Sequence, residues 1–419
     1  MPSERPRRGR PGVRPRGKGR SDPAVDSARR PPPRPARAGS LDQLLAAKEI
    51  VVSCGSGGVG KTTIAAAAAT MAAVHHGGRV LVVTVDPARR LADALGLAAL
   101  GNKETRISPQ AFAEAGITPR GELWAAMLDT KQSWDALIRR HAPDLRTAEQ
   151  ILGNPLYQNV AGRFVQSHDY IAMERLYEIH SEGIYDLIVV DTPPSRNALD
   201  FLDAPERMAE FFSSRLLRWL TVPYRSRLAT LASRPFYQAA DRILGSQFLQ
   251  DVAEFFLLFQ TMHDGFVSRA EAVTRLLHDK RTTFLVVSTL EAAPVREAEA
   301  FVGALSERGL HLGAVVLNKV LPAYLRVPAS SEVAGRMAAG ASELGRRLTR
   351  EGEDDPAQVG RVLGEVAESF LNFALVACRE AEQEAELAVT PDVVATVPMF
   401  DTDIYDLAGV ANLGEQIWG

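Results

Sequence analysis

The 419-residue sequence contains only two cysteines, Cys54 and Cys378, and its eight histidines are scattered along the chain. Two cysteines so far apart form neither a disulfide framework nor a C-x-x-C metal clip. The histidines form no recognisable metal constellation with the acidic residues. The composition therefore excludes a small disulfide-stapled domain, and it gives no support for a structural zinc site.

Long apolar segments are also missing. The uncharged run IAAAAATMAAV at residues 64–74 is too short and too rich in alanine to span a bilayer, and no hydrophobic signal segment opens the sequence. With 46% apolar residues, the chain can bury one large core, or one core and a helical subdomain. We therefore expect a globular cytoplasmic protein, with peripheral attachment to a membrane as an alternative.

Charge is distributed unevenly. Residues 1–40 hold 11 Arg and 1 Lys against 3 acids, a net charge of +9, which leaves −12 for the other 379 residues. This arm is rich in Arg and Pro and has almost nothing apolar to bury, so we predict that it is disordered. A basic arm could contact nucleic acid or an anionic membrane surface. The alternative is a solvated leader that follows a misplaced start codon.

Six short apolar runs rich in β-branched residues predict buried strands. They are residues 49–54, 80–86, 185–191, 282–289, 312–320 and 393–398. Helical patterns separate several of them, as at residues 61–76 and 294–309. Apolar strands that alternate with helices are typical of a parallel sheet covered on both faces. We therefore predict an α/β fold for residues 41–419, a doubly wound and mostly parallel sheet with ligands at the carboxyl ends of its strands.

Two segments predict additional helices. Residues 201–280 hold 9 of the chain's 16 phenylalanines, and the run FFLLF at residues 255–259 is apolar around the whole helix. This insertion is therefore either the core of a helical subdomain or a binding surface for a hydrophobic client. A second helical block is predicted at about residues 330–387, where apolar residues recur at three- and four-residue steps.

A glycine-rich stretch, CGSGGVGKTT, lies between the first predicted strand and the helix that follows, and it contains the pattern GxxxxGK[ST]. In this pattern backbone N–H groups hold phosphates at a helix N-terminus, the lysine contacts the β- and γ-phosphates, and the hydroxyl binds Mg²⁺. The pattern thus predicts a phosphate-binding loop for ATP. Its predicted binding residues are Gly55, Ser56, Gly57, Gly58, Val59, Gly60, Lys61, Thr62 and Thr63.

Two aspartates end predicted strands beside this loop. Asp191 is placed to hold the Mg²⁺ shell, through a water molecule, and Asp86 is placed to face the γ-phosphate and to orient or deprotonate the attacking water. The candidate catalytic residues are therefore Lys61, Asp86 and Asp191, and the candidate metal ligands are Thr62 and Asp191. The alternative is that the two aspartates are helix N-caps.

In order and spacing, five motifs resemble the arsenical-pump and tail-anchored-protein-targeting ATPases, a family of the deviant-Walker-A class, and in particular the paired ArsA-like ATPases of GC-rich bacteria. The motifs are GSGGVGKTT, DPARRLADALG at residues 86–96, DTPPSRNALDFL at 191–202, VVLNK at 315–319 and VPMFDTDIYDLAGV at 397–410. The resemblance runs from about Glu49 to the C-terminus. It implies that residues 86–96 are switch I, and that DTPPS at residues 191–195 is switch II with Pro194 at its proline. It also implies that Asn318 reads the adenine edge and that the segment around Pro398 covers the base.

The chain departs from this family at three places. The family loop carries a lysine that reaches across a dimer to the partner's phosphates, whereas this loop has Ser56, whose hydroxyl supplies no positive charge. Arg89 stands where switch I usually has histidine, and Arg196-Asn197 replace a Gly-His pair in switch II. Either arginine could replace part of the lost charge or could pair with surface acids. With two cysteines, the chain also lacks the family's arsenite-binding and zinc-clamp sets, which argues against arsenite extrusion.

The motifs and the resemblance together predict a Mg²⁺-dependent ATPase that works as a nucleotide-switched dimer. Ser56 favours a heteromer in which a lysine-bearing paralogue completes this chain's site. The Phe-rich insertion is then the surface for a client. Two alternatives stay open, a non-catalytic scaffold gated by nucleotide, and a partitioning-type ATPase that binds DNA through residues 1–40.

Overall fold

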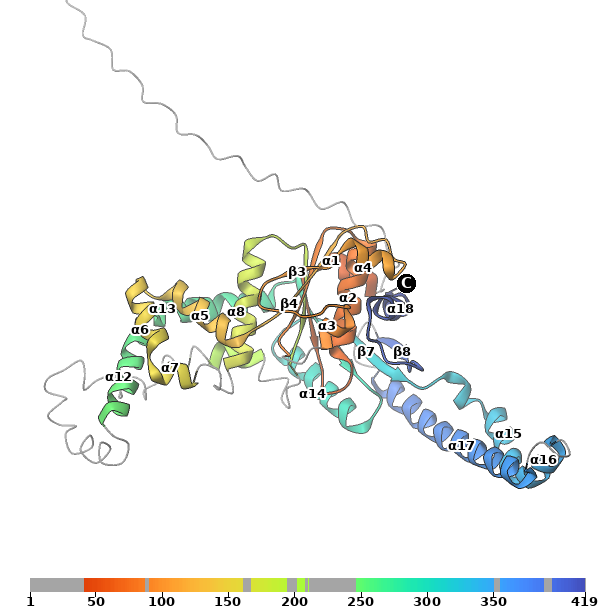
Figure 1. Ribbon diagram of the computed structural model, residues 1–419. Helices are drawn as coiled ribbons and strands as arrows, with labels where there is room; N and C mark the ends of the chain where they lie inside the picture. The colour runs from red at the N-terminus through yellow and green to blue at the C-terminus, as the bar shows by residue number, and fades with distance from the viewer. Residues whose placement is uncertain are drawn as a thin grey trace, which may run out of the picture. The chain divides into compact units, whose positions relative to one another are not determined.

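A computed structural model describes residues 41–86, 90–160, 167–193, 202–207, 210, 246–349, 355–387 and 394–418. A mostly parallel sheet with helices around it lies at its centre (Figure 1). The sheet has eight strands in the order β3-β4-β2-β5-β1-β6-β7-β8. The strands are β1 (Ile50–Cys54), β2 (Arg79–Thr84), β3 (Thr105–Arg106), β4 (Glu122–Met127), β5 (Leu187–Asp191), β6 (Thr282–Ser288), β7 (Leu312–Val320) and β8 (Val394–Pro398). The predicted α/β fold class is confirmed. The basic arm lies outside the described residues.

Six of these strands match the six apolar runs of the sequence, and β3 and β4 were not expected. Strand β4 pairs in parallel with β2 over its whole length, although its sequence ELWAAM contains no β-branched residue. Its alanines are buried where the sheet meets its helices, so packing decides the conformation here rather than strand propensity. Strand β3 has two residues and is antiparallel to β4, which makes it the exception to the parallel arrangement.

Helices cover both faces of the sheet. Val51 and Val189 point into one apolar cluster with α1, α2, α3 and α18, whereas Val52 and Val190 point into another with α8, α13 and α14. Successive side chains alternate between the two faces, so a sheet covered on both faces has continuous apolar strands. The helices of these two layers are α1 (Leu41–Ala47), α2 (Lys61–His75), α3 (Arg90–Ala94), α4 (Pro109–Glu114), α8 (Ser167–Glu182), α13 (His263–His278), α14 (Ala292–Glu307) and α18 (Leu407–Trp418).

A third apolar cluster consists of helices alone. It joins α5 (Thr130–His141), α6 (Leu145–Gly153) and α7 (Pro155–Val160) to α8, α12 (Ser246–Gln260) and α13. Phe259 is buried at its centre, with ring centroids 6.3 Å from Trp134 and 5.6 Å from Phe266, while Phe255 and Phe256 are half-buried. The Phe-rich segment therefore forms part of a core at Phe259. The helices between residues 130 and 160 were not expected to contribute to that core.

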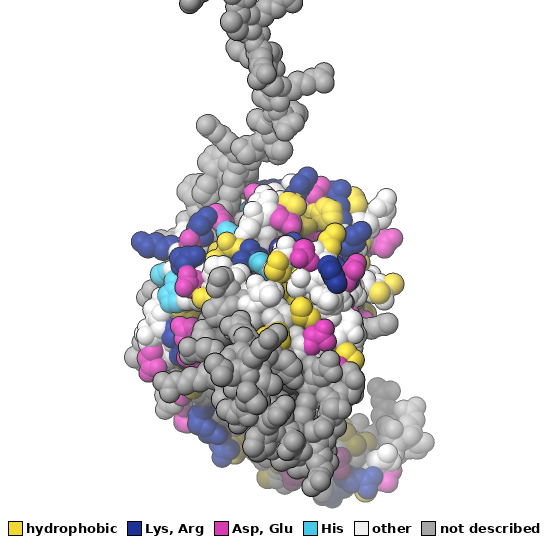
Figure 2. All heavy atoms as spheres, turned by 90° about the vertical axis from the view of Figure 1, so that its left-hand side faces the viewer, with side chains coloured by type: hydrophobic (Ala, Val, Ile, Leu, Met, Phe, Trp, Pro, Cys, Tyr) yellow, Lys and Arg dark blue, Asp and Glu magenta, His cyan; other side chains and the backbone are white. Residues whose placement is uncertain are grey.

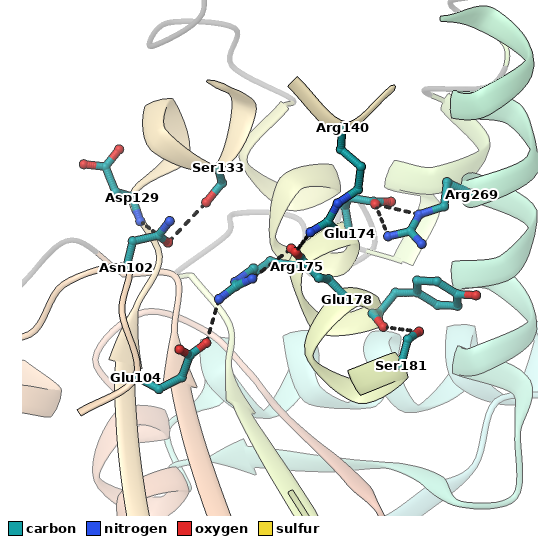
Figure 3. Close-up of polar contacts among 11 residues, drawn as sticks. Asn102, Glu104, Asp129, Ser133, Arg140, Glu174, Arg175, Glu178, Ser181 and Arg269 are labelled. Carbon is teal, nitrogen blue, oxygen red and sulfur yellow. Dashed lines mark hydrogen bonds and ion pairs between the residues drawn. The ribbon is translucent and has the colours of Figure 1, made fainter. Parts of the chain in front are cut away.

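Polar contacts along α8 fasten this helical cluster to the sheet (Figure 3). Arg175 pairs with Glu104, in the loop before β3, at 2.6 Å, and with Glu178 at 2.8 Å. On the same helix Glu174 accepts a hydrogen bond from Arg269 of α13 at 2.8 Å. All these groups are at least partly buried, so the pairs fix α8 more firmly than exposed ion pairs would.

After β7 the chain forms the short helix η1 (Ala323–Arg326), then α15 (Pro328–Ala339), α16 (Ala341–Leu348) and the long helix α17 (Pro356–Leu387). Helix α17 packs along α15 and α16 and returns towards the sheet, where Glu380 accepts a hydrogen bond from the backbone N–H of Leu321 at 3.0 Å. The second predicted helical block, at residues 330–387, falls on these helices.

On the face shown in Figure 2, Lys and Arg side chains are interspersed with Asp and Glu, and hydrophobic side chains are scattered among them. In the part of the chain that the structure describes, every helix is too short or too polar to cross a bilayer.

We predict that Phe259→Ala lowers the free energy of unfolding by about 3–5 kcal/mol, because it leaves a cavity among packed aromatic rings. Leu145→Ala is the matched control, since Leu145 is 76% exposed and its truncation should change stability by less than about 0.5 kcal/mol. Urea denaturation of both variants checks the prediction. Equal stability of the two variants would show that Phe259 is not a core residue.

Candidate nucleotide-binding site

The predicted phosphate-binding loop joins the end of β1 to the start of α2. Gly60 has a φ of 96°, and a Cβ there would collide with the side-chain amide of Asn318. That amide donates a hydrogen bond from Nδ2 to the carbonyl oxygen of Val59 at 2.8 Å. Gly55 is equally restricted, because its Cβ would meet the carbonyl oxygen of Val287. The loop is thus clamped between β6 and β7, and two of its glycines are required by close approach as well as by backbone conformation.

Lys61 lies inside the curve of this loop. Its Nζ donates a hydrogen bond to the backbone carbonyl of Ser56 at 2.7 Å, and the residue is 6% exposed. Burial is the main cause that lowers the pKa of Lys61, and the negative charges of Asp191 and Asp86 oppose it. The Ser56 hydroxyl is buried and has no hydrogen-bond partner among the described residues. One cation therefore lies at the centre of the loop, enclosed by backbone.

Asp191 ends β5 and is fully buried. Its Oδ2 accepts hydrogen bonds from the hydroxyls of Thr62 and Thr84, each at 2.8 Å. Burial raises the pKa of Asp191 to about 6, although these two hydrogen bonds and the charge of Lys61 act to lower it. The side chain is therefore held by two hydroxyls from neighbouring elements.

A magnesium ion fits this group of residues. Asp191 Oδ1 is buried and lacks a hydrogen-bond partner in the described part of the chain, and the Thr62 hydroxyl lies beside the same carboxylate. Carboxylate and hydroxyl oxygens are the ligands that Mg²⁺ takes in nucleotide sites. Thr84 was not expected to take part, although its place two residues before Asp86 at the end of a strand was a usable signal.

Asp86 follows β2 and is 8% exposed. Its backbone N–H donates to the Thr84 hydroxyl at 3.1 Å, so Asp86 and Asp191 are linked through one side chain. In the sheet, Thr84 of β2 and Ser53 of β1 are both direct neighbours of Asp191. The two predicted aspartates and the phosphate-binding loop therefore meet at the carboxyl edge of three adjacent strands, as the doubly wound fold predicts.

Lys61, Thr62 and Asp86 line one cavity of about 670 Å³, a size typical of small-molecule sites. Asp191 is hydrogen-bonded to Thr62 but is not among the residues that line this cavity. From the predicted set, the cavity contains Gly58, Gly60, Lys61, Thr62, Thr63, Asp86, Asn318 and Pro398. Residues 399, 400 and 402–405, which follow Pro398, also contribute, and Tyr405 is exposed there. Arg89, Pro194, Arg196 and Asn197 lie outside the described residues.

Two cations of the cavity were not expected from the sequence. Arg90 begins α3, and its positive charge is among the causes that lower the pKa of Lys61. Lys319 has a φ of 60° and directs its Nζ to the carbonyl oxygen of Gly58 at 3.5 Å. The signal for Arg90 was present, because it lies four residues after Asp86 within the motif that resembles switch I.

Comparison with known proteins agrees with this geometry. A model of the anion-transporting ATPase family matches residues 48–327. The chain belongs to that family. It is 27% identical over 268 residues to "Putative arsenical pump-driving ATPase 2" of Aquifex aeolicus, covering 64% of this chain and 79% of that protein. Over 273 residues it is 27% identical to "ATPase ASNA1 homolog 1" of Paramecium tetraurelia, which covers 64% and 73% of the two chains.

A third relative is "ATPase BagA" of Mycobacterium tuberculosis, 25% identical over 282 residues, with 65% of each chain covered. The resemblance predicted from the motifs is confirmed, and the family is one of nucleotide-binding ATPases. The matched segment ends at Val327, one residue before α15 begins. Helices α15 to α17 therefore lie beyond the part of the chain that matches the family model.

We predict that Gly60→Ala weakens binding of a fluorescent ATP analogue by about 100-fold, because the new methyl group displaces Asn318 and the loop. Gly58→Ala is the matched control. Gly58 also has a positive φ, of 83°, but a Cβ there would have nothing within 4 Å. Its substitution should cost only the backbone strain, about tenfold in affinity. Equal losses in the two variants would show that contact with Asn318 does not hold the loop.

Proposed function

We propose that the chain binds ATP with Mg²⁺ in this cavity and hydrolyses it to ADP and phosphate. The observation that carries the proposal is that Lys61, Thr62 and Asp86 line one cavity where three adjacent strands end, with Asp191 hydrogen-bonded to Thr62. A cation, a hydroxyl and two carboxylates are the groups that phosphoryl transfer requires. Membership of an ATPase family supports the same reaction class.

In the proposed reaction, a water molecule attacks the γ-phosphorus while the bond to the bridging oxygen of ADP breaks. Asp86 accepts a proton from the water, and Lys61 with the loop N–H groups stabilises charge on the phosphate oxygens. Thr62 would hold Mg²⁺ directly and Asp191 would hold it through a water molecule, and the ion would supply positive charge to the phosphate oxygens. Thr84 keeps the Asp191 carboxylate oriented through its hydrogen bond to Oδ2.

The far end of the cavity is proposed to hold the adenine. Asn318 uses one Nδ2 hydrogen for Val59, and its Oδ1 accepts from the backbone N–H of Lys319 at 2.9 Å. An amide has a second hydrogen and a second lone pair, so Asn318 can hold the loop and read a base edge together. The segment around Pro398 supplies apolar groups over the base.

Turnover also needs positive charge where Ser56 replaces a lysine. We propose that a lysine-bearing paralogue supplies it across a nucleotide-switched heterodimer, with ATP drawing the subunits together and hydrolysis releasing them. Among the described residues, Arg90 is one source that this chain itself offers, since it lines the cavity and lies close enough to Lys61 to influence its pKa. A chain with neither source in use would bind ATP as a scaffold without turnover.

The proposed output of the switch is a client or membrane partner. The half-buried Phe255 and Phe256 lie beside the core at Phe259, and they are the described residues through which the helical cluster could contact a hydrophobic client. Residues 1–40 offer a second contact, because their charge suits nucleic acid or an anionic membrane surface. Binding through that arm would fall steeply with salt and would disappear when the arm is removed.

We predict that Asp86→Asn lowers kcat by about 100- to 1,000-fold, because the amide cannot accept the proton of the attacking water. The Kd for ATP should change by less than about threefold, since the substitution keeps the shape of the side chain. Steady-state phosphate release and equilibrium binding, measured with Mg²⁺ present, separate the two quantities. A variant that keeps the wild-type kcat would remove Asp86 from the mechanism.

The Ser56 position generates another prediction. We expect the isolated wild-type chain to turn over slowly and Ser56→Lys to raise kcat by about 100-fold or more, because it restores charge at the transferring phosphate. Wild-type turnover equal to that of Ser56→Lys would contradict the need for a partner's lysine. In that case Arg90→Ala identifies the source, because it should abolish turnover only if Arg90 supplies the charge. ATP binding without turnover in wild type and in Ser56→Lys would support the scaffold instead.

A further inference from the structure

Helix α17 carries two apolar stripes along its length. The inner stripe is buried against α15 and α16 and includes Gly360, Ala367, Ala374 and Ala377. The outer stripe faces solvent among the described residues, and its apolar members are between 44% and 55% exposed. We call it the outer seam, and it consists of Val362, Val366, Ser369, Phe373 and Val376.

The spacing of the outer seam indicates what kind of surface covers it. Its members are separated by four, three, four and three residues, which is the heptad spacing of a coiled coil. A helix that only covers a globular core usually has a wider apolar face, and this helix already has one on its inner side. Exposed side chains in a heptad seam therefore require a second helix.

We propose that this second helix is α17 of another copy of the chain, packed antiparallel. In the register of the proposal, Val366 packs against Val376 of the second copy, and Ser369 packs against Phe373. Because the two copies are related by a two-fold axis, each of these two contacts occurs twice, which gives four layers of paired side chains. Large and small side chains are thus matched in the central layers, as close packing of an interface requires. Val362 lies one position beyond the four matched layers.

Charges beside the seam select the same register. Glu365, Asn372 and Arg379 are exposed and follow one edge of the seam at seven-residue intervals. In the antiparallel register Glu365 lies opposite Arg379 of the second copy, twice by symmetry, and Asn372 lies opposite Asn372. A parallel pair would instead place Phe373 against Phe373, Ser369 against Ser369, and the Glu365 carboxylate beside an apolar residue. The antiparallel arrangement therefore satisfies both shape and charge.

The contact is independent of the nucleotide site. It uses residues beyond the segment that matches the family model, and no group that lines the cavity takes part. Four layers make a small interface, so we expect a dissociation constant on the order of 10 μM and association that requires neither ATP nor Mg²⁺. Self-association through α17 can therefore be tested independently of the proposed ATP hydrolysis.

Sedimentation velocity of the full chain, between about 1 and 100 μM in EDTA without nucleotide, tests self-association. We expect a reversible dimer in wild type and at least about tenfold weaker association in Phe373→Asp, because a carboxylate would be buried opposite Ser369. Val333→Asp is the matched control, since Val333 is 53% exposed but lies on α15 outside the seam. A wild-type monomer at the highest concentration would overturn the proposal and leave the seam to a helix of another protein. Equal weakening by both variants would also overturn it.

Cross-linking tests the register. In a Cys378→Ser chain, Asn372→Cys should form a covalent dimer on mild oxidation, because the two residues face each other across the axis. Glu365→Cys alone should not, since its copy lies about 21 Å away along the helix. A mixture of Glu365→Cys and Arg379→Cys chains should cross-link. Equal cross-linking of the two single variants would indicate random collision or another register, and would overturn the antiparallel assignment.

Discussion

The arrangement of the site depends on one buried carboxylate. Asp191 lies where β1, β2 and β5 end side by side, and a fully buried negative charge is costly unless its oxygens are hydrogen-bonded or bind a cation. Thr62 of α2 and Thr84 of β2 satisfy one oxygen. The phosphate-binding loop, the strand that precedes Asp86 and the candidate metal site are therefore tied to the same atom. Any movement of one of them alters the environment of the others.

Asn318 fixes the phosphate-binding loop from the side of β7, as Asp191 does from the side of β5. It is buried, it bonds to Val59, and it lies so close to Gly60 that only glycine fits there. The loop is thus held from β7 as well as from β5, by side chains that come from distant parts of the sequence. Such fixed backbone dipoles are what an anion site needs, because they need not reorganise when the ligand arrives.

The sequence predicted best those features that depend on residues close together in the chain. The loop from Gly55 to Thr63, the strand ends at Asp86 and Asp191, and the six apolar strands were all predictable, since each depends on residue type and spacing within a short window. Strand β4 was not predicted, because it is an alanine-rich segment whose neighbours make it a strand. Lys319 was missed for a related reason, because its place in the site depends on a contact with Gly58, which is distant in the sequence. Thr84 and Arg90 were missed although each lies within four residues of Asp86.

The length and attachment of α17 have a mechanical consequence. Its 32 residues span about 48 Å, and its end near the sheet is bonded through Glu380 to Leu321, three residues after Asn318. A helix of that length acts as a lever with its fulcrum beside the cavity. A tilt of about 5° about Glu380 would move the far end, which lies 24 residues away at Pro356, by roughly 3 Å. A small movement of β7 therefore produces a larger displacement of the distal end of α17. In the other direction, a force on that distal end exerts a large torque on the helix where it is bonded to Leu321.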